Sequence, residues 1–392
     1  MGSNPVGDMQ RRQPAPPLPN VWRWGFPVFT LVLAIWAVLL TTGGLTTVLD
    51  SRRGEIREAV TDPTAPGFEA FVEQTWSMLV ATEDASGELV QVAVVAAADR
   101  TGGGGIVLLV PIEVKVADCE TACRLVDRYR DGGLEAVQAA TAAILDVQVT
   151  GATLLTPARW ESLAGHVDPV PVDLPMDLMT TASDGTSVVR FSAGLMDIAS
   201  FDVVDLFGLH SAGPELDRLG RQHEWWQGWL HAVADGEPKD HLPNLDLDVI
   251  DLLGTLARGQ VRVLSSPWMT VKDVVVAEEA ELANVVLEMF PFPIPRVPGQ
   301  RPSVRLLNGT GDPSVDGPAR EAVLRAGVDL AVVGNYRNDG VIQTRVLYRD
   351  PEREAEAEAL AEAIGGGVLF DQYLSPVTDL TVVIGADFLL RG

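Results

Sequence analysis

Hydrophobic and polar positions divide the chain into regions of different pattern. Residues 66–289 alternate strand-like and helix-like stretches, which predicts a mixed-sheet α/β (α+β) unit with helices. The stretch IVLLVPIEVKV (106–116) raises a specific question, because an apolar run meets a proline and Glu113 then stands between branched apolar neighbours. Since proline cannot donate to a strand ladder, we expect the strand to weaken there. The pattern leaves open whether this carboxylate does chemistry or only faces water.

A second pattern occupies residues 303–392. It predicts a strand, an amphipathic helix ended by Gly327, two strands, an acidic helix and a closing strand. In sequence these elements are VRLL, PAREAVLRAG, LAVVGN, VIQTRVLY, EREAEAEALAEAIGGG and DLTVVIGAD. The order β-α-β-β-α-β is typical of a small α+β unit of the split βαβ kind. Five prolines in residues 290–302 predict a semi-rigid, extended linker before this unit.

The N-terminal region has the pattern of a membrane anchor. Residues 25–49 carry no charged side chain, and about 20 apolar residues suffice to cross a bilayer. Two tryptophans and an arginine at the leading edge favour the headgroup level. We therefore predict a transmembrane helix over residues 21–49, after a disordered, proline-rich cytoplasmic tail at residues 1–20. A buried core helix is the alternative, and arginines on both sides of the span leave its orientation undecided.

Charge and cysteine usage narrow the classes of function. A formal net charge of −25 without a Lys/Arg stripe repels phosphate backbones, so nucleic-acid binding is disfavoured. Cys119 and Cys123 are too few for a structural zinc site and have the wrong spacing for C-x-x-C redox chemistry. A disulfide between them fits a location outside the cytoplasm, and two reduced thiols are the alternative.

Several motifs in the last unit carry a resemblance to a known family. They are the LNGTG turn, the RAG that ends the first helix, the strand closing on VGN, and the final VVIGAD. In this combination, residues 303–392 closely resemble the LytR C-terminal domain of actinobacterial envelope proteins. That domain often follows a LytR-CpsA-Psr (LCP) catalytic domain, so the resemblance implies an LCP-like unit at residues 66–289.

The middle unit is similar to the LCP family but departs from it at several positions. WSMLVATED has Glu83 where the family has the aspartate of Gly-x-Asp, and ELVQVAVVAAAD begins with Glu88 near another expected aspartate. In IVLLVPIEVKV, Ile112 and Glu113 replace the arginine and aspartate of Pro-Arg-Asp.

Farther along the chain, one arginine motif is kept and another is missing. ELDRLGRQHEWWQGWL (215–230) is similar to the family's Arg-x-x-Arg-Gln helix and retains Arg218 and Arg221. The arginine pair expected just before it is absent from VDLFGLHSAG (204–213). Trp225 and Trp229, four residues apart on the predicted helix, indicate a buried apolar stripe.

The resemblance implies a specific chemistry. LCP domains hold a prenyl chain in an apolar pocket, bind its pyrophosphate with arginines and carboxylate-bound Mg²⁺, and transfer the linked glycan to peptidoglycan. By this resemblance, Glu83, Glu88 and Glu113 are candidate metal ligands, and Arg218, Arg221 and Glu113 are candidate ligand-binding residues. Arginine supplies planar, bidentate donors to a pyrophosphate, which isoleucine cannot. The alternatives are solvated acids at strand ends, and arginines on the helix surface or in salt bridges.

Two hypotheses follow from the missing arginines. In the first, the protein is a single-pass membrane protein of the cell envelope with residues 51–392 outside the cytoplasm. Its LCP-like unit is then non-catalytic and binds a polyprenyl-linked precursor, a glycopolymer or peptidoglycan, or a cell-wall enzyme. In the second, a rewired site transfers glycopolymers with Mg²⁺. Two or more arginine side chains converging on Glu113 would favour the enzyme. Transcriptional regulation is disfavoured by the membrane span and the acidity.

Overall fold

A computed structural model describes residues 60–116, 123–209, 215–243 and 248–390. Residues 62–392 form one compact unit, which contains two large sheets and several two-stranded ones. No helix within the described ranges is both long and apolar enough for a membrane span. The span predicted at residues 21–49 lies outside these ranges.

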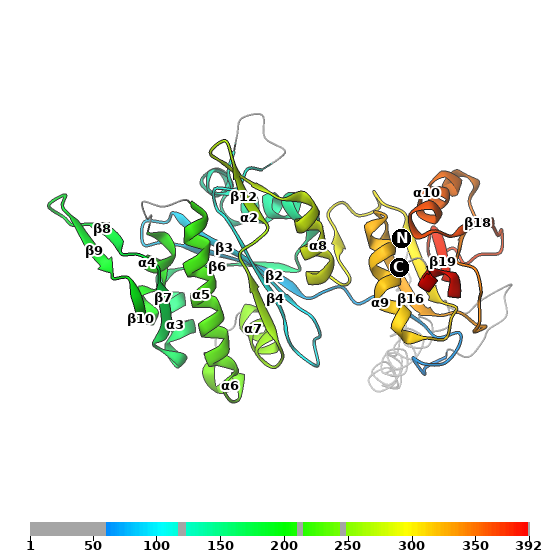
Figure 1. The fold of residues 1–392 in the computed structure, drawn as a ribbon, viewed down its shortest axis with the longest axis horizontal. Helices are drawn as coiled ribbons and strands as arrows, with labels where there is room; N and C mark the ends of the chain where they lie inside the picture. Colours follow the sequence, from blue (N-terminus) through cyan, green and yellow to red (C-terminus); the bar gives the residue numbers. More distant parts are fainter. Residues whose placement is uncertain (1–59, 117–122, 210–214, 244–247, 391–392) are drawn as a thin grey trace, which may run out of the picture. The chain divides into compact units, whose positions relative to one another are not determined.

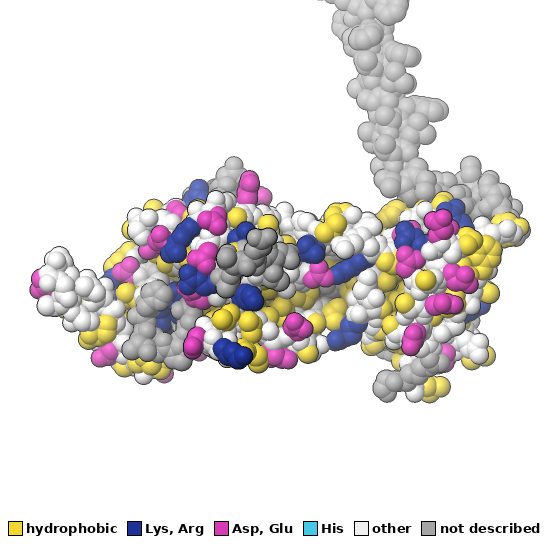
Figure 2. Space-filling model, turned by 90° about the horizontal axis from the view of Figure 1, so that it is seen from above, with side chains coloured by type: hydrophobic (Ala, Val, Ile, Leu, Met, Phe, Trp, Pro, Cys, Tyr) yellow, Lys and Arg dark blue, Asp and Glu magenta, His cyan; other side chains and the backbone are white. Residues whose placement is uncertain are grey.

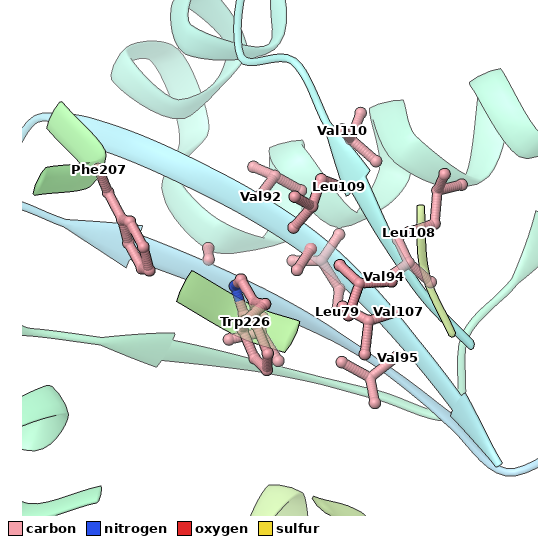
Figure 3. Packing of buried hydrophobic residues seen from close by; sticks show 14 of the residues in the cluster. Leu79, Val92, Val94, Val95, Val107, Leu108, Leu109, Val110, Phe207 and Trp226 are labelled. Atoms are coloured by element: carbon pink, nitrogen blue, oxygen red, sulfur yellow. The ribbon is translucent and has the colours of Figure 1, made fainter. Parts of the chain in front are cut away.

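The first large sheet is mixed, and its central strands are buried on both faces. Its order is β11-β4-β3-β2-β6, with antiparallel pairing of β2 to β3 and β3 to β4 and parallel pairing of β6 and β11 at the two edges. The strands are β2 (Ser77–Glu83), β3 (Leu89–Ala97), β4 (Gly105–Val110), β6 (Gly151–Leu155) and β11 (Val261–Leu264). Strands covered on both faces read as continuous apolar runs, as β3 and β4 do. Figure 3 shows their valines and leucines packed together.

Helices cover this sheet on both sides. Helix α2 lies on one side and α5 and α7 lie on the other in Figure 1. The helices of the middle unit are α2 (Leu125–Leu145), α3 (Pro157–Ala164), α4 (Val203–Gly208), α5 (Glu215–Ala234), α6 (Pro238–His241), α7 (Asp248–Ala257) and α8 (Glu279–Met289). A break inside α2 occurs at Gly133, whose φ of 63° is one that glycine adopts readily.

Two-stranded pairings and short 3₁₀ turns complete the described part of the chain. The paired strands are β7 (Val170–Leu174) with β10 (Gly194–Ile198), β8 (Leu178–Thr181) with β9 (Ser187–Phe191), β12 (Trp268–Val271) with β13 (Val274–Ala277), and β5 (Val147–Gln148) with β14 (Ile294–Pro295). The 3₁₀ turns of the chain are η1 (Gly165–Val167), η2 (Ser200–Asp202), η3 (Pro313–Val315), η4 (Pro351–Arg353) and η5 (Ala386–Leu390).

Five aromatic side chains form the interior between the sheet and its helices. Trp160 of α3, Phe207 of α4 and three tryptophans of α5 (Trp225, Trp226 and Trp229) are all fully buried. Trp160 makes edge-on contacts with the other four, at centroid distances of 5.2 to 6.4 Å. Trp225 and Trp229 stack at 5.7 Å, which confirms the predicted apolar stripe.

The C-terminal sheet is built from two βαβ units that meet at a central strand. Its strands and helices are β15 (Ser303–Asn308), α9 (Asp316–Arg325), β16 (Asp329–Asn335), β17 (Arg345–Tyr348), α10 (Glu354–Ile364), β18 (Gly367–Phe370) and β19 (Leu380–Ile384). The pairs β15–β16 and β17–β18 are each parallel, and β19 lies between β15 and β17. The predicted order omits β18, because this short strand begins at the last of the three glycines that end the predicted helix. The strand predicted from VIQTRVLY is shorter than expected and covers only its last four residues.

An edge strand of this sheet comes from a distant part of the sequence. Strand β1 (Glu69–Phe71) pairs antiparallel with β16, although residues 66–289 were predicted to belong to the middle unit. Glu69 also forms an ion pair with Arg305 of β15 at 3.3 Å, with both side chains largely buried. Gly334 of the VGN motif allows this approach, since a Cβ there would lie 2.0 Å from the carbonyl oxygen of Phe68.

The proline-rich segment at residues 290–302 is extended, but it is not a free tether. Phe290 is buried, and the backbone carbonyl of Phe292 accepts a hydrogen bond from the amide of Thr75. The short strand β14 pairs with β5. The backbone of this predicted linker is therefore hydrogen-bonded to the middle unit.

Candidate functional site at the rim of the middle sheet

The stretch around Glu113 forms a tight turn at the end of β4. Strand β4 ends at Val110, and the amide of Val114 donates to the carbonyl of Pro111. Ile112 and Val114 are buried, at 5% and 1% exposure, whereas the Glu113 side chain is 22% exposed. The proline therefore ends the strand, and the two branched residues anchor the turn in the core. The carboxylate between them reaches the rim of the middle sheet, which is the side where β2 and β4 end and β3 begins.

Glu113 is bound by an arginine that the sequence interpretation did not use. Arg124, which precedes α2, donates from Nη1 to Oε2 of Glu113 at 2.5 Å. Its Nε and Nη2 donate to the two carboxylate oxygens of Asp127 at 2.9 Å, and Asp127 accepts the Arg124 backbone amide. The hydrogen bond from the Arg124 side chain lowers the pKa of Asp127 to about 2. Arg124 thus links the Glu113 turn to the first turn of α2.

The other two glutamates are also engaged by side chains of α2. The Tyr129 hydroxyl donates to Oε2 of Glu83 at 2.6 Å, and burial, reinforced by this bond, raises the pKa of Tyr129 to about 12. Arg130 donates from Nε and Nη2 to Oε2 of Glu88 at 2.9 and 2.8 Å. The start of α2, RLVDRYR, therefore supplies a hydrogen-bond donor to each of the three glutamates. Its density of arginines was the signal available in the sequence.

These contacts bear directly on the magnesium that the resemblance implies. Among the residues that the structure describes, no three His, Cys, Asp or Glu side chains are placed to share a metal ion. Glu83, Glu88 and Glu113 do not form such a group, and each is held by a separate donor on α2. Each carboxylate already accepts a hydrogen bond from Arg124, Tyr129 or Arg130, so Mg²⁺ would compete with these donors for its oxygen ligands.

Arg218 and Arg221 are buried on α5, not exposed on its surface as one interpretation had them. Each is only 4% exposed. Arg221 donates from Nε to the carbonyl of Leu206 at 2.7 Å and from Nη2 to the carbonyl of Leu209, so it closes the C-terminal end of α4. Burial lowers the pKa of Arg221 to about 10. Its guanidinium donates to backbone carbonyls of the same chain, so these donors are not available to a ligand.

Arg218 lies in the electrostatic field of Glu113. Burial and the neighbouring Arg221 charge lower the pKa of Arg218 to about 10, while Glu113 opposes this shift. Glu113 therefore has one arginine in direct contact, Arg124. It also favours the charged form of a second arginine, Arg218. The sequence motif identified Arg218 as a candidate, whereas Arg124 is identified only by its contact across the rim.

Two further observations concern the surroundings of the rim. Cys123, next to Arg124, is disulfide-bonded, and Cys119, the only other cysteine of the sequence, lies outside the described residues. Acidic and basic side chains are interspersed on the face drawn in Figure 2, which shows no continuous basic stripe.

Comparison with solved structures shows weak similarities over part of the chain. B. subtilis TagV is 12% identical with a TM-score of 0.41, over 55% of this chain and 95% of that one. B. subtilis TagT is 16% identical with a TM-score of 0.40, over 61% and 95%. A LytR-Csp2A-Psr enzyme from Actinomyces oris is 15% identical with a TM-score of 0.41, over 59% and 92%. In sequence, no curated protein matches the chain.

The C-terminal unit has a specific match. Residues 301–388 match the family model described as LytR cell envelope-related transcriptional attenuator. The matched range contains the LNGTG, VGN and VVIGAD motifs, and it begins and ends within a few residues of the predicted unit at 303–392. The predicted LytR C-terminal domain is confirmed, and the chain is one that carries this domain.

Proposed function

We propose that the protein acts in the cell envelope and that its middle unit binds a polyprenyl-pyrophosphate-linked glycan precursor without transferring it. The LytR C-terminal domain supports the cell-envelope role, and the LCP-like motifs support the ligand class. The observation that carries the non-catalytic part is the rim itself. Each of the three glutamates is already bound by Arg124, Tyr129 or Arg130 of the same chain.

The physical argument concerns the charge of the pyrophosphate. A metal-dependent transferase offers free carboxylates to Mg²⁺, and the metal then neutralises the phosphate oxygens. Here Glu113 and Glu88 are neutralised by Arg124 and Arg130, and Glu83 accepts a hydrogen bond from the neutral Tyr129 hydroxyl. Of the two cations near Glu113, Arg124 already donates to both Glu113 and Asp127, which leaves less positive charge to stabilise a leaving group. Binding without turnover is the expected result, because removing one preorganised donor typically costs about 10²–10³ in rate.

The protein is further proposed to be anchored by residues 21–49, with residues 51–392 outside the cytoplasm. A bonded Cys123 supports this orientation, since disulfides persist in oxidising compartments. Fusion of a reporter that is active only in the cytoplasm to Gly392 tests the orientation. Absence of signal is expected, and a strong signal would rule out this topology.

A working transferase is the second candidate, because two arginines lie near Glu113. Ile112 stands where the resembled family has an arginine, and Arg124 supplies a guanidinium to the neighbouring Glu113. A rewired site could therefore still bind and polarise a pyrophosphate. Its distinguishing property is turnover. The two candidates therefore differ in one measurable quantity, the release of phosphate from a prenyl pyrophosphate.

The deciding experiment uses the full chain with farnesyl pyrophosphate as the probe. Binding and Mg²⁺-dependent phosphate release are measured for the parent, for Glu113→Gln and for Glu73→Gln. Glu73 is a matched control, because it is also paired with an arginine, Arg100. It precedes the start of β2, whereas the candidate site lies at the end of that strand. We expect binding that EDTA does not reduce, and release at background in all three proteins. Turnover by the parent that is lost only in Glu113→Gln would establish the enzyme instead, and absence of binding would refute both candidates.

A further inference from the structure

The C-terminal unit contains a cavity that the proposed function does not use. Its volume is about 280 Å³. One wall is the start of α9, with Asp316 and Arg320, and another is Phe292 of the proline-rich segment. Asn308 of LNGTG and Asn335 of VGN lie at the ends of β15 and β16 and line its base. The motifs that identify the domain therefore surround this cavity.

The remaining wall is formed by the segment that leads into β1. Pro63 and Phe68 line the cavity, and the Asn335 side chain fixes this segment by donating to the carbonyls of Pro63 and Ala65 at 2.9 and 3.0 Å. The amide of Asn335 also donates to the carbonyl of Phe68. The cavity is thus complete only when residues 63–68 are docked on the C-terminal sheet.

The polar groups of the cavity include a donor without an acceptor. The Nε of Arg320 is buried and has no hydrogen-bond partner within the protein, whereas Nη2 lies 3.9 Å from a carboxylate oxygen of Glu321. A ligand or a water that accepts from Nε would remove the cost of this unmade bond. The Arg320 guanidinium lies 5.7 Å from the ring centroid of Phe292, so a charged donor and an aromatic face stand together. On the same helix, Asp316 brings a carboxylate, one oxygen of which accepts from Asn308 at 2.8 Å.

This combination selects against charged ligands. An anion would meet the Asp316 carboxylate at the start of α9, and a cation would meet the Arg320 guanidinium. A neutral molecule with several hydroxyl groups can donate to the carboxylate and accept from the guanidinium at the same time. The Phe292 ring offers an apolar face to the C–H side of such a molecule. A volume near the lower end of ligand pockets limits the fit to about one ring.

We propose that this cavity binds one sugar ring of a neutral glycan, with hydroxyl groups on Arg320 and Asp316 and the ring's C–H face on Phe292. The site lies in the LytR C-terminal domain, apart from the Glu113 rim, and it does not depend on the function proposed for that rim. It would give the C-terminal domain a contact with glycan of its own.

The test uses the full chain and four probes: glucose, galactose, mannose and N-acetylglucosamine. Binding is measured by saturation-transfer NMR and by the shift of thermal unfolding with sugar concentration. The variants are Arg320→Met, which keeps the apolar stem and removes the donors, and Phe292→Leu, which keeps apolar volume and removes the ring. Arg325→Met is the matched control, because Arg325 lies on the same helix and bonds to Asn284 outside the cavity.

We expect at least one sugar to bind the parent and Arg325→Met equally. Arg320→Met should weaken that binding at least about tenfold, the usual cost of losing a charged hydrogen bond, and Phe292→Leu should weaken it less. Unfolding temperatures without sugar show whether each variant is folded. No binding by any of the four sugars would overturn the proposal. Unchanged binding in Arg320→Met, or competition by phosphate or acetate, would do the same.

Discussion

The two large sheets of the protein obtain their edge strands in different ways. In the middle sheet, both edges, β6 and β11, come from the sequence of the middle unit itself. In the C-terminal sheet, the edge strand β1 comes from before the middle unit, so that 236 positions separate Glu69 from its ion-pair partner Arg305. Strands before and after the middle unit in sequence, β1 and β15, therefore belong to the same C-terminal sheet and both pair with β16.

The two cores differ in the same sense. The interior of the middle unit contains five packed aromatic rings, Trp160 and four others, which come from helices α3, α4 and α5 of the same unit. The C-terminal core is built mainly from small aliphatic side chains, and one side of its sheet is completed by β1. The comparison teaches that the middle unit depends on its own packing, whereas the C-terminal domain depends on a strand that its family model does not include.

The largest expected effect is on the aromatic core. Trp160→Ala should lower the free energy of unfolding of the middle unit by about 3–5 kcal/mol, because it leaves a cavity among four rings. Trp160→Phe should cost less, since it loses mainly the hydrogen bond to Thr82. Urea unfolding followed by tryptophan fluorescence reports mainly this unit, because six of the nine tryptophans lie in residues 66–289 and none lies in residues 303–392. Phe201→Ala, at a 65% exposed position, is the control and should change little.

A second effect tests the borrowed strand. Glu69→Gln should lower the stability of the C-terminal sheet by about 3 kcal/mol, because it leaves the Arg305 charge buried without its carboxylate partner. Hydrogen exchange of the β15 and β16 amides measures this loss. The double variant Glu69→Leu with Arg305→Met should recover most of it, since an apolar pair replaces the ion pair. Equal exchange in the parent and Glu69→Gln would show that β1 contributes little.

A smaller loss is expected from one methyl group at the same edge. Gly334→Ala places a Cβ against the backbone of Phe68 and should displace β1, at a cost of about 1–3 kcal/mol. Faster hydrogen exchange at residues 69–71 is the measurement. Gly367→Ala is the control, because nothing lies within 4 Å of its added Cβ. Exchange that rises equally in both variants would contradict the role given to Gly334.

The smallest effect concerns the rim of the middle unit. Because its hydrogen bond with Arg124 lowers the pKa of Asp127 from 3.8 to about 2, the carboxylate stabilises the fold above pH about 4. That contribution should fade as the pH falls from about 4 through about 2. Asp127→Asn should lack this part of the acid dependence, whereas Asp131→Asn, also on α2, should keep it. Urea unfolding at pH 5 and pH 2.5 compares them, and parallel acid profiles for parent and Asp127→Asn would refute the coupling.

The sequence predicted the elements that local patterns define. The continuous apolar runs form β2, β3 and β4, and Trp225 and Trp229 are buried as predicted. Burial of apolar side chains is the dominant favourable term in folding, so such patterns predict buried elements well. The proline at the end of β4 was placed correctly, since its missing N–H acts locally. The motifs of residues 303–392 were sufficient to identify the LytR C-terminal domain.

Tertiary structure alone decided which residues meet across the chain. Nothing in Glu69–Phe71 indicates a partner in β16, because a three-residue strand carries almost no pattern and its pairing lies far away in sequence. The same holds for the rim, where the glutamates were visible at strand ends but their partners on α2 were not. Sequence spacing shows what a residue can do, whereas the fold determines which group it meets. That is why Glu83, Glu88 and Glu113 looked like metal ligands in the sequence and are, in the structure, bound by Tyr129, Arg130 and Arg124.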